Sequence, residues 1–289
     1  VETLKFNAIV GNPPYQEETG AGSIITGKKP VYHNFINLAL DMDLRYICMI
    51  IPSRWTNGGI GLDHFRSRME SKGKHIRHIV DDMEWDIPVF ESAMIAGGVM
   101  YFIYDGQYTG KCLYKNISKY NENEMYRSLI WKPTFIRNNK LLSVVLCVKS
   151  YNEVTMNNYC RYNAFGLESY ERGDETGELR LLSSKEKSGI SVQKIKCGID
   201  LINQYKIAIS GTTPGGGAVN KDGKYKVLAL TTILKPLEVC TGTYIVLSNN
   251  WSLSQAEYIL RYIRTKFVRA LIQATISSMH ITPYSFTYV

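Results

Sequence analysis

The amino-acid sequence predicts an α/β fold, the second half of a mixed or parallel sheet, followed by an α+β region. Two observations support this. The first hundred residues alternate apolar runs of strand length with amphipathic stretches of helix length. From Lys111 onward the pattern changes to short strands and polar loops, with two predicted helices. The chain has 289 residues, enough for two domains, for which we predict the ranges 1–108 and 109–289.

The N-terminal half is predicted element by element. Residues 4–11 (LKFNAIVG) are rich in strand-forming residues and end at a Pro-Pro pair, which neither a helix nor a central strand tolerates. Residues 32–42 carry apolar side chains at the spacing of an amphipathic helix. Residues 45–52 form a continuous apolar run, typical of a strand covered on both faces. The next three elements are predicted as a helix, a strand and a strand with a glycine interruption, at 62–71, 76–81 and 94–104.

The C-terminal half contains the two predicted helices. The first covers residues 137–149. The second begins at Ser254, whose spacing to Glu257 suits a capping box, and continues through Leu271. Glycine-rich and polar loops are predicted between the strands, the longest at residues 211–223.

Composition excludes several classes of protein. The longest apolar runs, at 47–52 and 94–104, are too short to cross a bilayer, and no charged-then-apolar leader opens the sequence. None of the six cysteines lies within four residues of another, so no Cys-x-x-Cys metal knuckle is present. We therefore expect a cytoplasmic protein with free thiols, no metal site and no membrane partner.

The charge is distributed unevenly along the chain. Through Gly110 there are 10 Lys and Arg against 13 Asp and Glu, whereas from Lys111 there are 24 against 13. A basic half beside a mildly acidic half favours a polyanion partner for the basic half. A simple contribution to solubility would produce the same asymmetry, so charge alone leaves both interpretations open.

The most informative element is the tetrapeptide Asn12-Pro13-Pro14-Tyr15, which directly follows the first predicted strand. Open α/β sheets bind ligands at the carboxyl ends of their strands. An exocyclic amine such as adenine N6 is a poor nucleophile because its lone pair is delocalised into the ring. Two acceptors, the Asn12 side-chain oxygen and the Pro13 carbonyl, could draw this nitrogen toward a reactive geometry.

The remaining residues of the tetrapeptide fit the same chemistry. The two prolines stiffen the loop, so that the acceptors are preorganised. Tyr15 offers a ring on which a base can stack, worth about 1–3 kcal/mol by analogy with single-strand binders. A base in a duplex reaches such a pocket only when it is flipped out. The alternative is a proline-rich turn with a packed tyrosine.

Beyond these arguments, the sequence resembles a known family. FNAIVGNPPYQ resembles motif IV of the amino-methyltransferases, which act on adenine N6 or cytosine N4 in DNA. ICMIIPSRW and VFESAMIAGGVMYFIYD resemble later motifs of the Eco57I-like restriction-modification adenine methylases. Residues 209–218, 226–243 and 266–289 resemble that group's target-recognition region. The resemblance implies the C-terminal half of a Rossmann-like methyltransferase sheet, then an α+β target-recognition domain.

The resemblance also implies an activity and a set of site residues. The activity would be site-specific adenine-N6 methylation of double-stranded DNA with S-adenosylmethionine as methyl donor. Asn12, Pro13 and Tyr15, with Pro14 in the same catalytic loop, would hold the flipped adenine. Phe90 would stack on its other face, unless it is a core residue. Arg54, with Trp55, would line the mouth of the site and contact DNA, unless both are ordinary loop residues.

The sequence departs from the family in the cofactor half. The family binds S-adenosylmethionine with a glycine-containing loop and an acidic residue that precede motif IV in this subgroup, but only eleven residues precede Asn12 here. Gly215-Gly216-Gly217 lies in a polar loop without a strand-then-helix frame, and we reject it as the cofactor loop. We expect a truncated or split enzyme that is inactive alone. Asn12 and Pro13 would contribute only one edge of the cofactor site, and a second chain or upstream segment the rest.

The glycine loop has a better use in DNA binding. Gly215, Gly216 and Gly217 would let the backbone approach a phosphate, while Lys221, Lys224 and Lys226 add positive charge. His280 and the Ser277-Ser278 pair are further candidates for the same surface. The alternative is a flexible surface loop.

Three other functions remain open at this stage. A methyltransferase acting on RNA or on a protein glutamine could use the same tetrapeptide, although a basic extension as long as 111–289 argues against it. A catalytically inactive DNA-binding or specificity module could keep half of the site. A nuclease could use Asp63, Glu70 and Lys72, but these lie on a predicted helix rather than on the strand that such a site requires.

Overall fold

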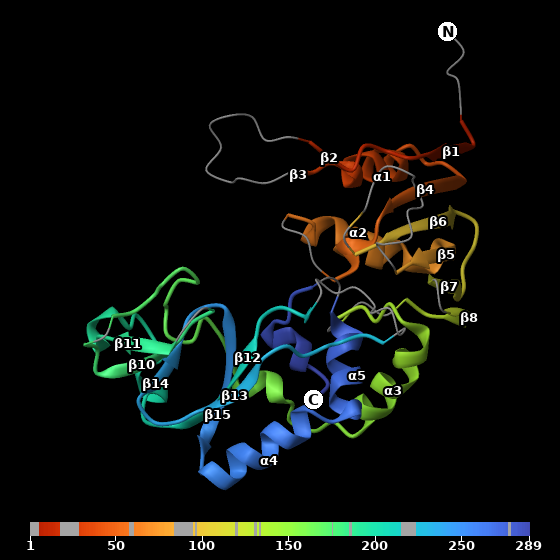
Figure 1. Ribbon diagram of the computed structural model, residues 1–289. Coiled ribbons are helices and arrows are strands. Elements are labelled where there is room, and N and C mark those ends of the chain that lie inside the picture. Colours follow the sequence, from red (N-terminus) through yellow and green to blue (C-terminus); the bar gives the residue numbers. More distant parts are fainter. Residues whose placement is uncertain are drawn as a thin grey trace. The chain divides into compact units, whose positions relative to one another are not determined.

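The structure is a computed structural model, and the residues that it describes are 6–17, 29–57, 61–83, 95, 97–118, 121–129, 132, 134–174, 176–184, 187–214, 224–276 and 279–289. The chain divides into two compact units, Val1–Leu142 and Ser143–Val289 (Figure 1). Buried apolar side chains form one core cluster in the first unit and two in the second.

A six-stranded mixed sheet organises the first unit. Its strand order is β1-β4-β6-β5-β7-β8. Strands β1, β4, β5 and β7 run in one direction, and β6 and β8 run in the opposite direction. The strands are β1 (Ala8–Gly11), β4 (Tyr46–Pro52), β5 (Ile76–Asp82), β6 (Val99–Asp105), β7 (Cys112–Ser118) and β8 (Asn121–Arg127). This sheet, with helices between its parallel strands, confirms the predicted α/β class and is compatible with half of a Rossmann-like sheet.

Two helices connect the parallel strands, as predicted. Helix α1 (Tyr32–Asp41) lies between β1 and β4 and buries Tyr32, Ile36 and Ala39, which share one helical face. Helix α2 (Asp63–Lys72) buries Phe65 and Met69. A two-stranded ribbon of β2 (Gln16–Glu17) and β3 (Lys29–Pro30) precedes α1.

The predicted strand at 94–104 begins only at Val99. Gly97 and Gly98 have φ angles of 90° and 79°, a left-handed conformation that is incompatible with an extended strand, so the strand starts after them. A Cβ at Gly98 would lie 1.9 Å from the backbone oxygen of Asp82, so only glycine fits this crossing. The glycines therefore bring the chain close to the end of β5.

The first compact unit continues beyond residue 108 because β7 pairs with β5 and β8 pairs with β7. It ends within α3 (Asn139–Ser150), where the division falls between Leu142 and Ser143. The predicted ranges 1–108 and 109–289 describe functional domains and stay a proposal.

The second unit combines two small sheets with two helices. The four-stranded sheet has the order β13-β12-β15-β9 and the three-stranded sheet the order β11-β10-β14. The strands are β9 (Cys160–Tyr162), β10 (Leu179–Leu182), β11 (Lys187–Ile190), β12 (Tyr205–Ser210), β13 (Thr231–Leu234), β14 (Glu238–Cys240) and β15 (Tyr244–Trp251). Short 3₁₀ turns across both units are η1 (Ser53–Thr56), η2 (Gly73–His75), η3 (Met156–Tyr159), η4 (Val192–Lys194), η5 (Ile199–Leu201) and η7 (Pro283–Phe286).

The prediction of one long helix from Ser254 to Leu271 is wrong. Helix α4 (Leu253–Ile263) is capped by Ser252, which forms a reciprocal capping box with Gln255. Thr265 has an extended backbone, and its side chain accepts a hydrogen bond from the Val268 amide, which starts α5 (Lys266–Thr275). A second cap thus divides the apolar stripe into two helices. Within the described parts of the chain, no helix is long and apolar enough to cross a membrane.

Candidate functional site

The Asn-Pro-Pro-Tyr loop begins where β1 ends, at the carboxyl edge of the sheet. Asn12 and Pro14 are exposed, Pro13 is buried, and Tyr15 is half-buried against the core of the first unit. Burial raises the pKa of the Tyr15 hydroxyl to about 12, so the phenol is neutral at physiological pH. The loop therefore anchors one proline and the tyrosine while it presents the asparagine to solvent.

The exit of the loop is held by backbone pairing. The Val31 amide donates to the Tyr15 carbonyl at 3.2 Å, and the β2–β3 ribbon pairs Gln16 with Pro30. The entry is held by the pairing of Gly11 on β1 with Met49 on β4. Because both ends are tied, the loop is preorganised rather than free to adopt many conformations.

The neighbouring loops follow the same edge of the sheet. Strand β4 ends at Pro52, which pairs with Val99 at the start of β6, and Val99 also pairs with Asp82 at the end of β5. The turn η1 continues β4 and contains Arg54 and Trp55. The loops after β1, after β4 and before β6 therefore lie next to one another at this edge of the sheet.

Arg54 and Trp55 have different environments. Arg54 is exposed, which leaves its role in DNA binding a proposal. Trp55 is fully buried and its ring packs on Phe65 with centroids 5.3 Å apart. The expectation that Trp55 lines the mouth of the site is wrong, because its apolar surface is used in the core below η1.

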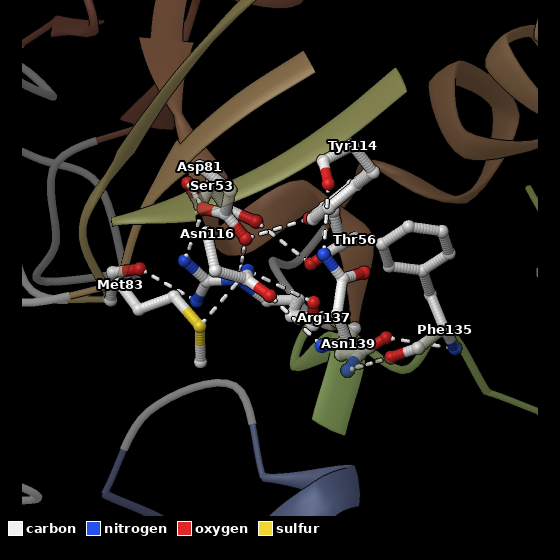
Figure 2. Close-up of polar contacts among 11 residues, drawn as sticks. Ser53, Thr56, Asp81, Met83, Tyr114, Asn116, Phe135, Arg137 and Asn139 are labelled. Carbon is white, nitrogen blue, oxygen red and sulfur yellow. Dashed lines mark hydrogen bonds and ion pairs between the residues drawn. The ribbon is translucent and has the colours of Figure 1, made fainter. Parts of the chain in front are cut away.

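A buried polar network lies farther along this edge (Figure 2). The carboxylate of Asp81, near the end of β5, is fully buried and accepts four hydrogen bonds. The donors are the Ser53 hydroxyl at 2.8 Å, the Tyr114 hydroxyl at 2.7 Å, and Arg137 Nε and Nη2 at 2.8 and 2.6 Å. Burial, followed by the negative charge of Asp81, raises the pKa of the Tyr114 hydroxyl well above its ordinary value. The network is thus a buried ion pair with both hydroxyls acting as donors.

The network also includes the segment that follows β8. Arg137 Nη1 donates to the Gly97 carbonyl at 2.7 Å, and the Asn116 side chain donates to the Arg137 carbonyl at 3.1 Å. Asn57, just after η1, forms reciprocal bonds with the backbone of Phe135. Sequence reasoning missed this network. The sequence shows Asp81 and Asp82 at the end of a predicted strand, but no pattern in the sequence indicates that Asp81 pairs with Arg137 in a later loop.

In the second unit, two of the predicted DNA-binding segments lie side by side. Thr212 and His280 form an isolated antiparallel bridge, and the Thr213 amide donates to the Met279 carbonyl at 2.8 Å. Thr212, His280 and Lys224 are exposed. The predicted residues Phe90, Gly215, Gly216, Gly217, Lys221, Ser277 and Ser278 lie outside the described residues.

Metal chemistry has no candidate among the described residues, where no three His, Cys, Asp or Glu side chains gather in a way that could hold an ion. The nuclease candidates Asp63, Glu70 and Lys72 lie on α2, as predicted from their helical context.

Comparison with known proteins bears on the part of the chain that carries the loop. The family model of the Eco57I restriction-modification methylase matches residues 1–90. Over residues 1–90 the chain is therefore similar to the Eco57I-like methylases. This segment includes β1, the Asn-Pro-Pro-Tyr loop, α1, β4, α2 and β5.

Part of the chain is also similar to a curated protein. An uncharacterized adenine-specific methylase of Mycoplasma pneumoniae (strain ATCC 29342 / M129 / Subtype 1) is 36% identical over 112 residues. The alignment covers 38% of this chain and 26% of the relative, so the chain spans about a quarter of that protein's length. The solved structure of the type IIG restriction endonuclease BpuSI aligns with 90% of this chain and 42% of its own, at 9% identity. The TM-score of this alignment is 0.36.

Proposed function

We propose that the chain provides the target-base half of a DNA adenine-N6 methyltransferase of a restriction-modification system. The observation that supports this most directly is the loop geometry: an exposed Asn12, a buried Pro13 and a half-buried Tyr15 at the carboxyl end of β1. The Eco57I-like segment contains this loop, and the relative from Mycoplasma pneumoniae is described as an adenine-specific methylase.

The proposed mechanism uses the loop as a pair of acceptors. The Asn12 side-chain oxygen and the Pro13 carbonyl accept hydrogen bonds from the two N–H groups of adenine N6. This pulls the nitrogen toward a tetrahedral geometry in which its lone pair can attack a methyl group. Tyr15 supports the flipped base from one face, and Phe90 is proposed for the other. Because the Tyr15 hydroxyl stays neutral, the base stacks on an uncharged ring.

S-adenosylmethionine is the proposed methyl donor, and it supplies the electrophilic methyl group when bound. Asn12 and Pro13 fit one edge of its site, because Asn12 is exposed and can face a cofactor as well as a base. We propose that a second chain or another segment forms the remainder.

The outer side of β1 supports the proposal of a further segment. Strand β1 stands at the end of the sheet order, with Val10 on it 76% exposed. Helix α1, which follows β1 in the chain and packs against β4, leaves Leu38 61% and Phe35 44% exposed. An edge strand with an exposed apolar side chain is suited to pairing with another strand.

Double-stranded DNA is the proposed substrate, and the second unit is proposed to contact it. The bridge between Thr212 and His280 brings the residues that lead into the glycine loop beside the segment after α5, which supports the proposal that both segments contact DNA. Lys224, which follows the glycine loop in the sequence, adds an exposed positive charge. A catalytically inactive specificity module would share this surface, so methyl transfer itself must be measured.

The test compares two asparagine variants of the protein that contains this sequence. It is incubated with unmethylated genomic DNA and S-adenosylmethionine, and the digested nucleosides are quantified by mass spectrometry. We expect N6-methyladenine from the wild type, a loss of at least a hundredfold in Asn12→Ala, and a normal yield in Asn34→Ala. Asn34 is an exposed asparagine on α1 and serves as the matched control.

Affinity for DNA separates chemistry from binding. We expect the affinity of Asn12→Ala for DNA to stay within about twofold of the wild-type affinity, because the variant loses only the hydrogen bond to the amine of one base. Retained methylation in Asn12→Ala would eliminate the acceptor mechanism. N4-methylcytosine in place of N6-methyladenine would eliminate adenine as the target.

A further inference from the structure

The buried network around Asp81 takes no direct part in the proposed chemistry, yet it is attached to the loops beside the Asn-Pro-Pro-Tyr loop. We propose that Arg137 and Asp81 are positioning residues for methyl transfer. In this proposal they hold the edge loops, defined as Ser53–Thr56 and Gly97–Gly98, in the arrangement that the target base requires. The inference rests on the proposed function and adds residues that the family resemblance did not indicate.

Arg137 connects the two edge loops through its guanidinium. Nε and Nη2 donate to the two oxygens of Asp81, and Nη1 donates to the Gly97 carbonyl at 2.7 Å. The side chains of Arg137 and Asp81 are 6% and 0% exposed, so water does not compete for these bonds. A planar fork with three of its donors engaged fixes direction as well as distance, which a lysine ammonium cannot do.

Ser53 connects the network to the loop after β4. Its hydroxyl donates to Asp81 Oδ1 at 2.8 Å, while its amide donates to the Gly98 carbonyl at 3.0 Å. The β4 turn, the Gly97–Gly98 loop and the end of β5 are therefore joined through two side chains and one carboxylate. Figure 2 shows Ser53 and Arg137 approaching Asp81 together.

Tyr114 distinguishes positioning from general stabilisation. Its hydroxyl donates to the same carboxylate at 2.7 Å, but it comes from β7. In the strand order, β4 lies next to β1, whereas β7 is four places away, roughly 20 Å at the usual strand spacing. If the network only stabilises the fold, loss of either hydroxyl should affect methylation equally. If it positions the loops, loss of the Ser53 hydroxyl should slow methylation more than loss of the Tyr114 hydroxyl.

The experiment uses this matched pair in the protein that contains the chain. Ser53→Ala and Tyr114→Phe each remove one hydroxyl from Asp81 and leave the ion pair intact, so both variants should fold. We expect Ser53→Ala to lower kcat for DNA methylation about tenfold with KM for DNA within twofold, because small misplacements of reacting groups are costly. Tyr114→Phe should keep kcat within twofold. Arg137→Lys should lose kcat more severely than Ser53→Ala.

Amide hydrogen exchange gives a readout that does not depend on the reaction. In Ser53→Ala and Arg137→Lys, the amide at position 53 and those at 97–99 should exchange at least tenfold faster, while β8 amides keep their wild-type rates. Equal losses of kcat in Ser53→Ala and Tyr114→Phe would overturn the positioning role. Unchanged exchange at the edge loops would also overturn it. A wild type that makes no N6-methyladenine would overturn the proposed function, and the exchange pattern would still decide whether the network ties the loops.

Discussion

The ion pair between Asp81 and Arg137 allows a sharp prediction about stability. Asp81 is completely buried and accepts two of its four hydrogen bonds from Arg137. Replacing Arg137 with methionine removes both donors and leaves a buried carboxylate without its countercharge. Breaking such a pair from one side costs about 3–5 kcal/mol. That is a large part of the roughly 5–15 kcal/mol by which domains are usually stable.

The double variant tests the reasoning behind that figure. In Asp81→Asn with Arg137→Met no charge remains buried. Ser53 and Tyr114 donate to different oxygens of Asp81, so in the variant one hydroxyl can donate to the amide oxygen while the other accepts a hydrogen bond from the amide NH2. We therefore expect the double variant to lose less free energy of unfolding than the two single variants added together, by at least about 1 kcal/mol.

Urea unfolding of the full chain, followed by circular dichroism, measures these losses, and amide exchange of β5 reports on the first unit separately. Arg161→Met is the matched control because its ion pair with Asp200 is open to solvent, with side chains 49% and 57% exposed. It should cost less than about 1 kcal/mol. A loss in Arg137→Met no larger than in Arg161→Met, or strictly additive single losses in the double variant, would refute the argument.

Two further predictions concern the second unit. Replacing Lys221 and Lys224 with alanine should reduce the slope of log affinity for DNA against log salt by about 1 to 2, measured by fluorescence anisotropy, because each phosphate contact contributes about 0.9. The exposed pair Lys196 and Lys235 is the control, and an equal change there would contradict the assignment. Burial lowers the pKa of Lys206 to about 8, so between pH 8 and 10.5 the unfolded chain binds more protons than the folded chain. Stability should rise across this interval in chemical denaturation, and Lys206→Met should remove that component; an unchanged pH dependence would count against it.

The local elements of the first unit were predictable because each depends on its own segment. Helices α1 and α2 follow from apolar spacing, and β4 follows from a continuous apolar run. The Asn-Pro-Pro-Tyr loop was identified because its composition is unusual and its position follows a strand. Its assignment as a site stays a proposal, although the structure exposes Asn12 as a reactive loop requires.

The errors arose where a distant or competing contact decides the outcome. In the sequence Trp55 follows the end of a strand, as a loop residue would, but in the structure its ring packs on Phe65 of α2 and is buried in the core. The stripe from Ser254 to Leu271 has helical spacing throughout, yet the cap at Thr265 divides it, and spacing alone does not reveal which polar residue acts as a cap.

By itself, the sequence determined the α/β class, the positions of α1, α2, β4 and β5, and the loop that carries the proposed chemistry, since all three depend on neighbouring residues and on periodicity. Only the tertiary structure decided that β6 runs antiparallel between β4 and β5 and that Arg137 meets Asp81 beneath the edge loops. The physical reason is separation along the chain: the network joins residues 53, 81, 114 and 137, whose proximity is created by sheet pairing and leaves no periodic trace in the sequence.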